Sequence, residues 1–234
     1  MSRNQKTALV TGASAGLGRA LTCALVGDGW DVIGTARGSA ELTRLGNELG
    51  SALTTVHGDV SDAAHRAELA DLLFARPRLD LVVNNASRLG PSPMPKLRDI
   101  ELDELERILA TNVVAPLAIL QFATPKLLAS NGIAVNISSD AAVTPYEGWG
   151  GYGSAKAALD HLTAIYAAEN PGIAVYAFDP GDMRTAMHQA AFPGEDISDR
   201  PDPETVVPAL LRLFADRPPS GRYIAADLLA GASK

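Results

Sequence analysis

Cysteine is almost absent from this chain, since Cys23 is the only one in 234 residues. One cysteine cannot form an intrachain disulfide or a cysteine-based metal site, and such a composition is typical of a reducing compartment. Histidine is also scarce, and the four histidines show no metal-ligand spacing. We therefore expect no disulfide framework and no bound metal.

Positive charge is in deficit as well. Lysine and arginine total 20 against 27 acidic residues, which gives a net charge of -7, and no basic patch is visible in the sequence. Such a chain repels phosphate backbones and anionic lipid. No apolar run reaches the roughly eighteen residues that cross a membrane, and the N-terminus lacks the apolar core of a signal peptide. We expect a cytoplasmic protein without a nucleic-acid or membrane partner.

What the sequence does contain is an alternation of short β-forming runs with longer segments of helical period. At this length, with 47% hydrophobic residues, one core suffices, so residues 1–234 are expected to form a single domain. The alternation predicts an α/β fold, a Rossmann-like doubly wound parallel sheet of seven strands flanked by helices. The predicted strands are residues 7–11, 31–36, 53–58, 79–85, 133–138, 173–178 and 222–226.

The helical segments carry their own boundary signals. Gly27 and Gly29 should end the first helix, and Ser61 is a plausible N-cap for a helix that follows it. Residues 102–130 read as one helix that Pro116 should kink, because proline lacks the backbone donor.

Two stretches break the alternation, residues 88–99 and residues 182–204. Long loops beside the strand ends of such a sheet usually carry substrate sites, although surface decoration is the plainer alternative. We expect residues 182–204 to be a substrate loop.

The stretch TGASAGLG, residues 11–18, follows the first strand and opens a helix. Glycines there let the backbone turn and approach a pyrophosphate at the helix N-terminus, although small residues would equally allow close packing of helix on strand. The spacing, TGxxxGxG, resembles that of the short-chain dehydrogenase/reductase family.

Further motifs occur in the order of that family and extend the resemblance over essentially the whole chain. They are NNA at 84–86, Asn112, Ser139, the YxxxK pair Tyr152 and Lys156, and Pro180, Gly181 and Thr185 after the sixth strand. The stretch 136–162 is similar to the sepiapterin reductase and benzil reductase-like subgroup. Two departures stand out: Ser87 occupies a place where the family usually has glycine, and Ala225 lies near the place of a pterin-anchoring aspartate.

The resemblance implies a catalytic set of Asn112, Ser139, Tyr152 and Lys156. Tyr152 and Lys156 are four residues apart on a helix, so the ammonium is expected to lower the pKa of the phenol and make Tyr152 the proton donor. Ser139, rather than its rival Ser138, would hold the substrate oxygen. Lys156 would also bind the nicotinamide ribose, and Asn112 would anchor a water relay.

The cofactor is expected to be NADP(H). An acidic residue that selects NAD commonly ends the second strand, but this chain has Ala36 followed by Arg37, which can bind a 2′-phosphate. Arg19 either assists or is a solvated helix charge, and Asp59 either borders the adenine ring or caps a turn. The expected cofactor-binding residues are Gly12, Ser14, Gly16, Leu17, Gly18, Arg37, Asp59, Val60, Asn85, Ala86, Tyr152, Lys156, Pro180, Gly181, Met183 and Thr185.

The substrate pocket is expected to be apolar and to accept a ketone or diketone. Its predicted lining is Ser139, Ala141, Tyr146, Trp149 and Met187, with Leu89, Val143, Met183 and Phe192 nearby. The leading hypothesis is an NADPH-dependent carbonyl reductase acting on a small molecule. A β-ketoacyl carrier reductase and a non-catalytic NADP(H)-sensing protein remain alternatives. By the same resemblance the chain is expected to form a homodimer or a tetramer.

Overall fold

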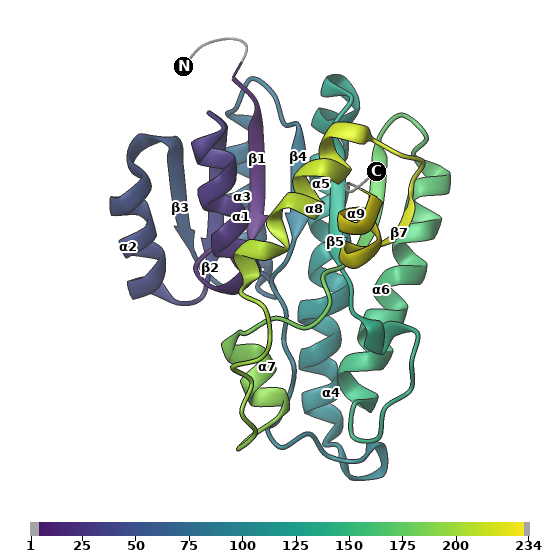
Figure 1. Ribbon diagram of the computed structural model, residues 1–234. Coiled ribbons are helices and arrows are strands. Elements are labelled where there is room, and N and C mark those ends of the chain that lie inside the picture. Colours follow the sequence, from purple (N-terminus) through teal and green to yellow (C-terminus); the bar gives the residue numbers. More distant parts are fainter. Residues whose placement is uncertain (1–4, 232–234) are drawn as a thin grey trace.

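The computed structural model describes residues 5–231 and contains one parallel sheet of seven strands (Figure 1). Their order across the sheet is β3-β2-β1-β4-β5-β6-β7, which confirms the predicted doubly wound fold. Each strand lies within two residues of its predicted bounds. The strands are β1 (Thr7–Thr11), β2 (Asp31–Ala36), β3 (Leu53–His57), β4 (Leu81–Asn84), β5 (Ile133–Ile137), β6 (Ala174–Asp179) and β7 (Gly221–Ile224).

Helices cover both faces of the sheet, and one further helix, α7 (Ala186–Ala191), lies beyond the carboxyl ends of the strands (Figure 1). One face carries α1 (Gly16–Gly27), α2 (Ser39–Leu49), α8 (Val207–Asp216) and α9 (Ala225–Ala230). The other carries α3 (Ala63–Phe74), α5 (Ala115–Ser130) and α6 (Gly150–Glu169), while α4 (Leu102–Leu109) lies beyond the strand ends and packs against α6.

Two apolar cores follow from this sandwich. Successive residues of a strand point to opposite faces, so Leu9 and Val10 enter different cores. Val10 packs with Leu21 of α1, and Leu9 packs with Leu69 of α3. Because both faces are covered, the central strands are apolar at nearly every position, which is why they are readable as continuous runs in the sequence.

The first helix ends as predicted, with Gly27 as its last residue and Gly29 at a φ of +82°. The Ser61 prediction is wrong, because Asp62 is the N-cap of α3 and its carboxylate accepts the amide of Ala64. Ser61 instead donates its amide and its hydroxyl to Asp59. Aspartate caps at least as well as serine, so the sequence allowed either choice.

Residues 102–130 do form one continuous helical run, but Pro116 lies in the first turn of α5 rather than inside a regular helix. The irregularity is a π-helical turn, Ala110–Val114, that immediately precedes the proline and contains Asn112. The run is long and apolar enough to cross a membrane by length and composition alone. Here it packs against the sheet through residues such as Ile119 and Leu127, as a core helix does.

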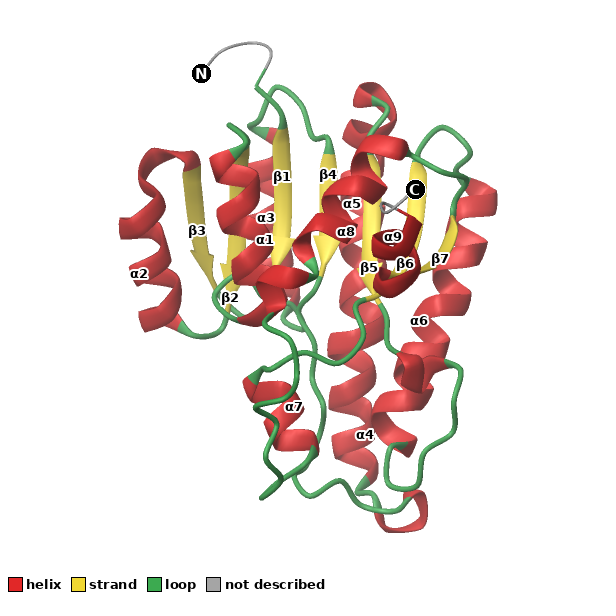
Figure 2. Ribbon diagram, viewed as in Figure 1, coloured by secondary structure: helices red, strands yellow, loops and turns green. Residues whose placement is uncertain are grey.

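The long loops after β4, β5 and β6 gather beyond the carboxyl ends of the strands (Figure 2). The predicted substrate loop, residues 182–204, includes α7, whose N-cap Thr185 accepts the amide of His188. The backbone of Arg184 donates to the carbonyl of Pro201. The loop is thus folded and lies beyond the carboxyl ends of the strands, where open α/β sheets bind their ligands.

Candidate active site

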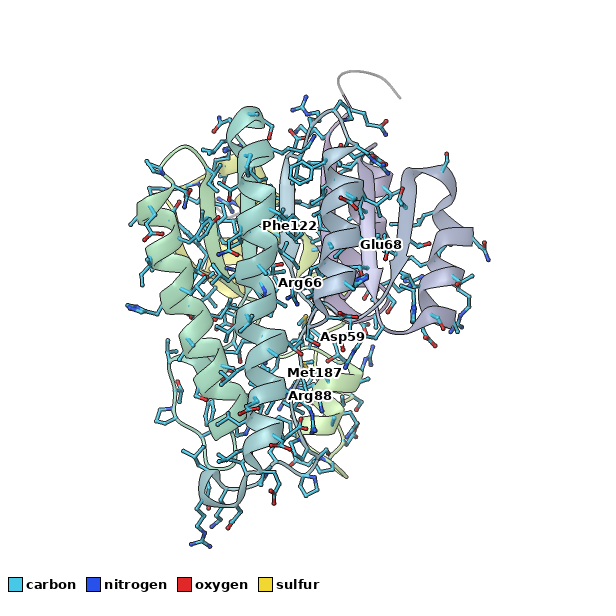
Figure 3. All side chains as sticks on the ribbon, turned by 180° about the vertical axis from the view of Figure 1, so that it is seen from behind. Asp59, Arg66, Glu68, Arg88, Phe122 and Met187 are labelled. Atoms are coloured by element: carbon cyan, nitrogen blue, oxygen red, sulfur yellow. The ribbon has the colours of Figure 1, made fainter. Side chains whose placement is uncertain are left out.

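A cavity of about 390 Å³ opens at the carboxyl ends of the strands. Figure 3, seen from behind, shows Asp59 near the strand ends and Met187 of α7 below it, and both residues line this cavity. The cavity brings together most of the predicted site: Gly12, Ser14, Gly16, Leu17, Arg37, Asp59, Val60, Asn85, Ala86, Ser139, Trp149, Tyr152, Lys156, Pro180, Gly181, Met183, Thr185 and Met187.

The glycine-rich turn forms one wall. Gly12 and Gly16 have φ values of +66° and +50°, which favour glycine, and both line the cavity. A Cβ on Gly18 would lie 2.2 Å from the carbonyl oxygen of Gly12, so Gly18 serves the close packing of the turn. Helix α1 begins at Gly16 with no side-chain cap from Ala15. Its first amides are therefore available to an anion, and the wall fits the pyrophosphate of a dinucleotide.

The end of β2 supplies the cation expected there. Arg37 is about half exposed, and its guanidinium lies 3.7 Å from the carboxylate of Asp59. Burial acts to raise the pKa of Asp59, but the hydrogen bonds from Ser61 and the charge of Arg37 hold it below its usual value. Asp59 therefore both lines the cavity and accepts the hydrogen bonds from Ser61 that order the turn after β3.

Arg19 does not join Arg37. Its guanidinium pairs with Glu48 of α2 at 2.7 Å, and both side chains are largely exposed. Of the two readings of Arg19, the structure supports the solvated helix charge.

Tyr152 and Lys156 lie in the first two turns of α6, both buried, with the lysine Nζ 5.5 Å from the centre of the tyrosine ring. The Nζ donates to the carbonyl of Ile137 at 2.6 Å. Burial raises the pKa of Tyr152 to about 12 and lowers that of Lys156 to about 8, although Asp160 and Asp179 oppose the lysine shift. The expected downward shift of the tyrosine pKa is therefore wrong for the protein alone, because desolvation outweighs the hydrogen bonding of Ser87 and Ser139, which acts to lower it.

The two candidate serines differ in what they reach. The hydroxyl of Ser139 donates to Asp140 at 3.0 Å, and its hydrogen bonding acts to lower the pKa of Tyr152. The hydroxyl of Ser138 points back to the carbonyl of Ser139, at 3.5 Å. The contact with Tyr152 favours Ser139 for the substrate oxygen.

Asn112 lies in the π-helical turn and is fully buried. Its Oδ1 accepts the amide of Arg88 at 2.8 Å and the hydroxyl of Ser87 at 3.1 Å, while its Nδ2 donates to the carbonyl of Arg88 at 2.8 Å. The side chain thus holds the loop after β4. That Asn112 anchors a water relay stays a prediction.

The substrate end is apolar. Trp149 packs edge-to-face on Tyr152, with ring centres 5.9 Å apart, and Phe192 packs on Trp149 at 5.7 Å. Ala141 and Tyr146 line a neighbouring hollow that shares Trp149 with the main cavity. The Tyr146 hydroxyl donates at 2.8 Å to Asp140, which lines the main cavity. A role for these two residues in the substrate pocket stays a prediction.

Sequence reasoning missed Arg222, which comes from β7 near the C-terminal end of the chain. Its guanidinium donates to Asp160 at 3.0 Å, to Asp179 at 2.7 Å and to the carbonyl of Ser139 at 3.1 Å. Arg222 therefore ties α6 and β6 to the serine segment beneath the cavity. An isolated arginine in an edge strand carries no signal that could have revealed this.

Lys156 makes the site costly in stability. Its pKa is lower in the folded chain than when unfolded, so the penalty is full below pH 8 and fades between about pH 8 and 10.5. We expect Lys156→Met to raise the free energy of unfolding at pH 7 by about 2 kcal/mol, since part of the gain is offset by the lost bond to Ile137. Urea unfolding at pH 7 and pH 10 measures this free energy in the variant and the wild type. The gain in stability should shrink at pH 10, and a variant less stable than wild type at pH 7 would contradict the destabilising effect assigned to Lys156.

No group of three or more metal-ligating side chains occurs among residues 5–231. The cavity is thus, within the part of the chain that is described, a groove whose inner end carries Tyr152, Lys156 and the three serines Ser87, Ser138 and Ser139.

Comparison with known proteins shows which family this chain belongs to. Residues 6–196 match the family model described as short chain dehydrogenase. A serine 3-dehydrogenase from Rhizobium radiobacter is 36% identical over 183 residues, covering 76% of this chain and 72% of the relative. A sepiapterin reductase from Mus musculus is 32% identical over 199 residues, covering 78% and 76%.

A solved structure supports the same family assignment. A short chain dehydrogenase from Shigella flexneri, complexed with NADP, is similar with a TM-score of 0.88 at 27% identity, covering 95% of this chain and 98% of that one. Because the family model matches most of the sequence and the curated relatives match three quarters of it, this chain belongs to the short-chain dehydrogenase family.

Proposed function

We propose that this protein is an NADP(H)-dependent carbonyl reductase that converts a ketone or diketone to an alcohol. The observation that carries the proposal is the meeting of Ser139, Tyr152 and Lys156 in the same cavity as the uncapped N-terminus of α1. The three side chains can donate a proton to a carbonyl oxygen and hold that oxygen, and the helix N-terminus can bind a pyrophosphate.

NADP(H) is preferred over NAD(H) because Arg37 follows β2 where an acidic residue would otherwise select the ribose hydroxyl. The Shigella flexneri relative is complexed with NADP, in agreement. The turn at Gly12 and Gly16 would hold the pyrophosphate, and Lys156 would bind the nicotinamide ribose. The bound cofactor supplies the hydride that reduces the carbonyl carbon.

The chain's own residues manage the oxygen. The Ser139 hydroxyl would hold the carbonyl oxygen, and Tyr152 would donate its proton to that oxygen as negative charge develops. A pKa of about 12 keeps Tyr152 in its proton-donating form throughout the neutral range. Donation remains favourable because an alkoxide is far more basic than a tyrosinate. The site is thus suited to reduction.

The cavity favours a neutral substrate. Its acidic side chains near Tyr152 are Asp140, Asp179 and Asp182, and its cations are Lys156, which is buried beneath, and Arg37 at the other end. A substrate carboxylate, such as that of serine, would meet these carboxylates without a free cation. Met183, Met187, Leu89 and Trp149 offer apolar contact instead.

The same charges weigh against an acidic carrier protein as partner, because Arg184 and Arg200, in the segment around α7, are paired with Asp202 and Asp199. A pterin also finds less support, since Ala225 is buried at the start of α9. We further propose a homodimer formed through α5 and α6, on which Leu128 and Ile165 are exposed.

The direct test is the consumption of NADPH, with NADH in parallel, on benzil, a simple 1,2-diketone, sepiapterin, an acetoacetyl thioester and, with NADP, serine. Oxidation of NADPH by a diketone at a higher kcat/KM than by the thioester supports the proposal. Turnover of serine alone would replace it by a hydroxy-acid dehydrogenase. Cofactor binding without any turnover would favour the non-catalytic NADP(H)-sensing alternative.

Arg37 offers a second test. In Arg37→Ala we expect the Kd for NADPH to rise about 10-fold to 100-fold, as loss of a hydrogen bond to a charged group predicts, with the Kd for NADH changed by less than about 3-fold. Fluorescence titration measures both. Arg19→Ala is the matched control, because it removes an arginine paired with Glu48 away from the cavity. Equal weakening of both cofactors would remove Arg37 from the proposed role.

A further inference from the structure

Ser87 stands immediately after the end of β4, where the family resemblance leads one to expect glycine, and its side chain lines the cavity. The residue adds a hydroxyl to the inner end of the site. Its Oγ donates to Oδ1 of Asn112 at 3.1 Å, and Ser87 and Tyr152 line the same cavity. Hydrogen bonding by Ser87 acts to lower the pKa of Tyr152.

We propose that Ser87 is an additional positioning residue, whose hydroxyl connects Tyr152 to Asn112 and donates a hydrogen bond to the tyrosinate that remains after proton transfer. The inference rests on the proposed function for its catalytic meaning. No covalent bond of Ser87 changes: the O–H bond of Tyr152 breaks, an O–H bond forms on the substrate oxygen, and the serine hydroxyl only turns.

Hydrogen-bond capacity explains why the serine can turn. A serine hydroxyl has one proton to donate and accepts from others through its oxygen. Oδ1 of Asn112 already accepts the amide of Arg88 at 2.8 Å, so it does not depend on the serine proton. While Tyr152 is neutral, the proton of Ser87 can point to Asn112. When Tyr152 loses its proton, the same serine proton can point to the phenolate.

The other groups around Tyr152 leave this task open. Lys156 donates to the carbonyl of Ile137 and lies over the face of the ring, and Ser139 is assigned to the substrate oxygen. Asp140 and Asp179 add negative charge that opposes tyrosinate, and Asp182 and His188 from the α7 segment line the same cavity. Burial is the largest influence and raises the pKa of Tyr152, whereas the bonds with Ser87 and Ser139 lower it.

The serine is also held in place. The backbone of Arg88 donates to and accepts from the Asn112 side chain, at 2.8 Å each way. The guanidinium of Arg88 pairs with Glu104 of α4 at 2.7 and 3.0 Å, and this bond to Arg88 holds the pKa of Glu104 below its usual value. Residue 87 is thus anchored between β4 and α4, as a pre-organised donor requires.

The experiment replaces Tyr152 by 3,5-difluorotyrosine, which is more acidic than tyrosine, and follows its ionisation by fluorine NMR in the protein with and without Ser87→Ala. The signal belongs to one residue and needs no turnover. We expect Ser87→Ala to raise the midpoint by about one pH unit, a tenfold change in the ionisation constant. Ser87→Gly, the residue usual in the family, should give the same shift and serves if the alanine variant does not fold.

Two controls separate the hydroxyl from general disturbance. Ser87→Thr keeps a hydroxyl and should keep the original midpoint. Ser154→Ala removes a hydroxyl two residues after Tyr152 that bonds only to carbonyls of its own helix, at Gly150 and Gly151, and should shift nothing. An unchanged midpoint in both Ser87→Ala and Ser87→Gly overturns the proposal.

Activity then tells the two proposals apart. If NADPH reduction proceeds, Ser87→Ala should lower kcat about tenfold with KM within about twofold, as removal of an interaction made with the developing tyrosinate predicts. Turnover with an unshifted midpoint would sink the serine's role and leave the reductase standing. A shifted midpoint without turnover on any carbonyl would sink the reductase and leave the hydrogen bond to Tyr152.

Discussion

Replacing Tyr152 by phenylalanine is expected to lower NADPH-dependent carbonyl reduction by at least about 10²-fold to 10⁴-fold, the range that general acid catalysis contributes. The substitution removes one oxygen that is buried beside Ser87 and Ser139 and leaves the ring packed against Trp149. Cofactor affinity should change by less than about threefold, because the glycine turn and Arg37 are untouched. Stopped-flow absorbance measures the chemical step, and fluorescence titration the binding.

Tyr166→Phe is the matched control for that experiment. Tyr166 lies on the same helix, and its hydroxyl bonds to Thr124 on α5, at 2.6 Å, away from the cavity. The variant should retain nearly full activity. If Tyr152→Phe also retained full activity, Tyr152 would not be the proton donor, and the family motif would have misled the assignment.

The strands and the glycine turn were predictable because their physical signals are local. A parallel strand covered on both faces must be apolar at successive positions, as Leu9 and Val10 are. A turn that needs positive φ at Gly12 and Gly16 favours glycine. The candidate pair of Tyr152 and Lys156 was readable because a four-residue spacing on one helix keeps its meaning wherever the helix lies.

What the sequence could not show depends on distance in space. The direction of the Tyr152 pKa shift is set by burial, and burial is a property of the whole fold. Tyr146 precedes α6 by a few residues, yet its hydroxyl bonds to Asp140 and the residue lines a neighbouring hollow. Asn112 is at the expected position, but its amide is engaged by Arg88, which only the loop after β4 could determine.

Arg222 is the clearest case, and its removal should have the largest effect on stability. Its guanidinium lies between the carboxylates of Asp160 and Asp179, whose side chains are only 15% and 5% exposed. Arg222→Met would leave both carboxylates buried without their shared partner. We expect a loss of about 3 kcal/mol in the free energy of unfolding at pH 7, in the range measured when one member of a buried ion pair is removed.

Chemical denaturation of a double variant tests the cause of that loss. Adding Asp179→Asn to Arg222→Met should recover part of the stability, because one of the two orphaned charges is then gone. Arg44→Met, which breaks an exposed pair with Glu41, should cost less than about 0.5 kcal/mol. A loss that Asp179→Asn does not reduce would mean that Arg222 acts through packing, and that the buried charges beneath the candidate site are neutralised in some other way.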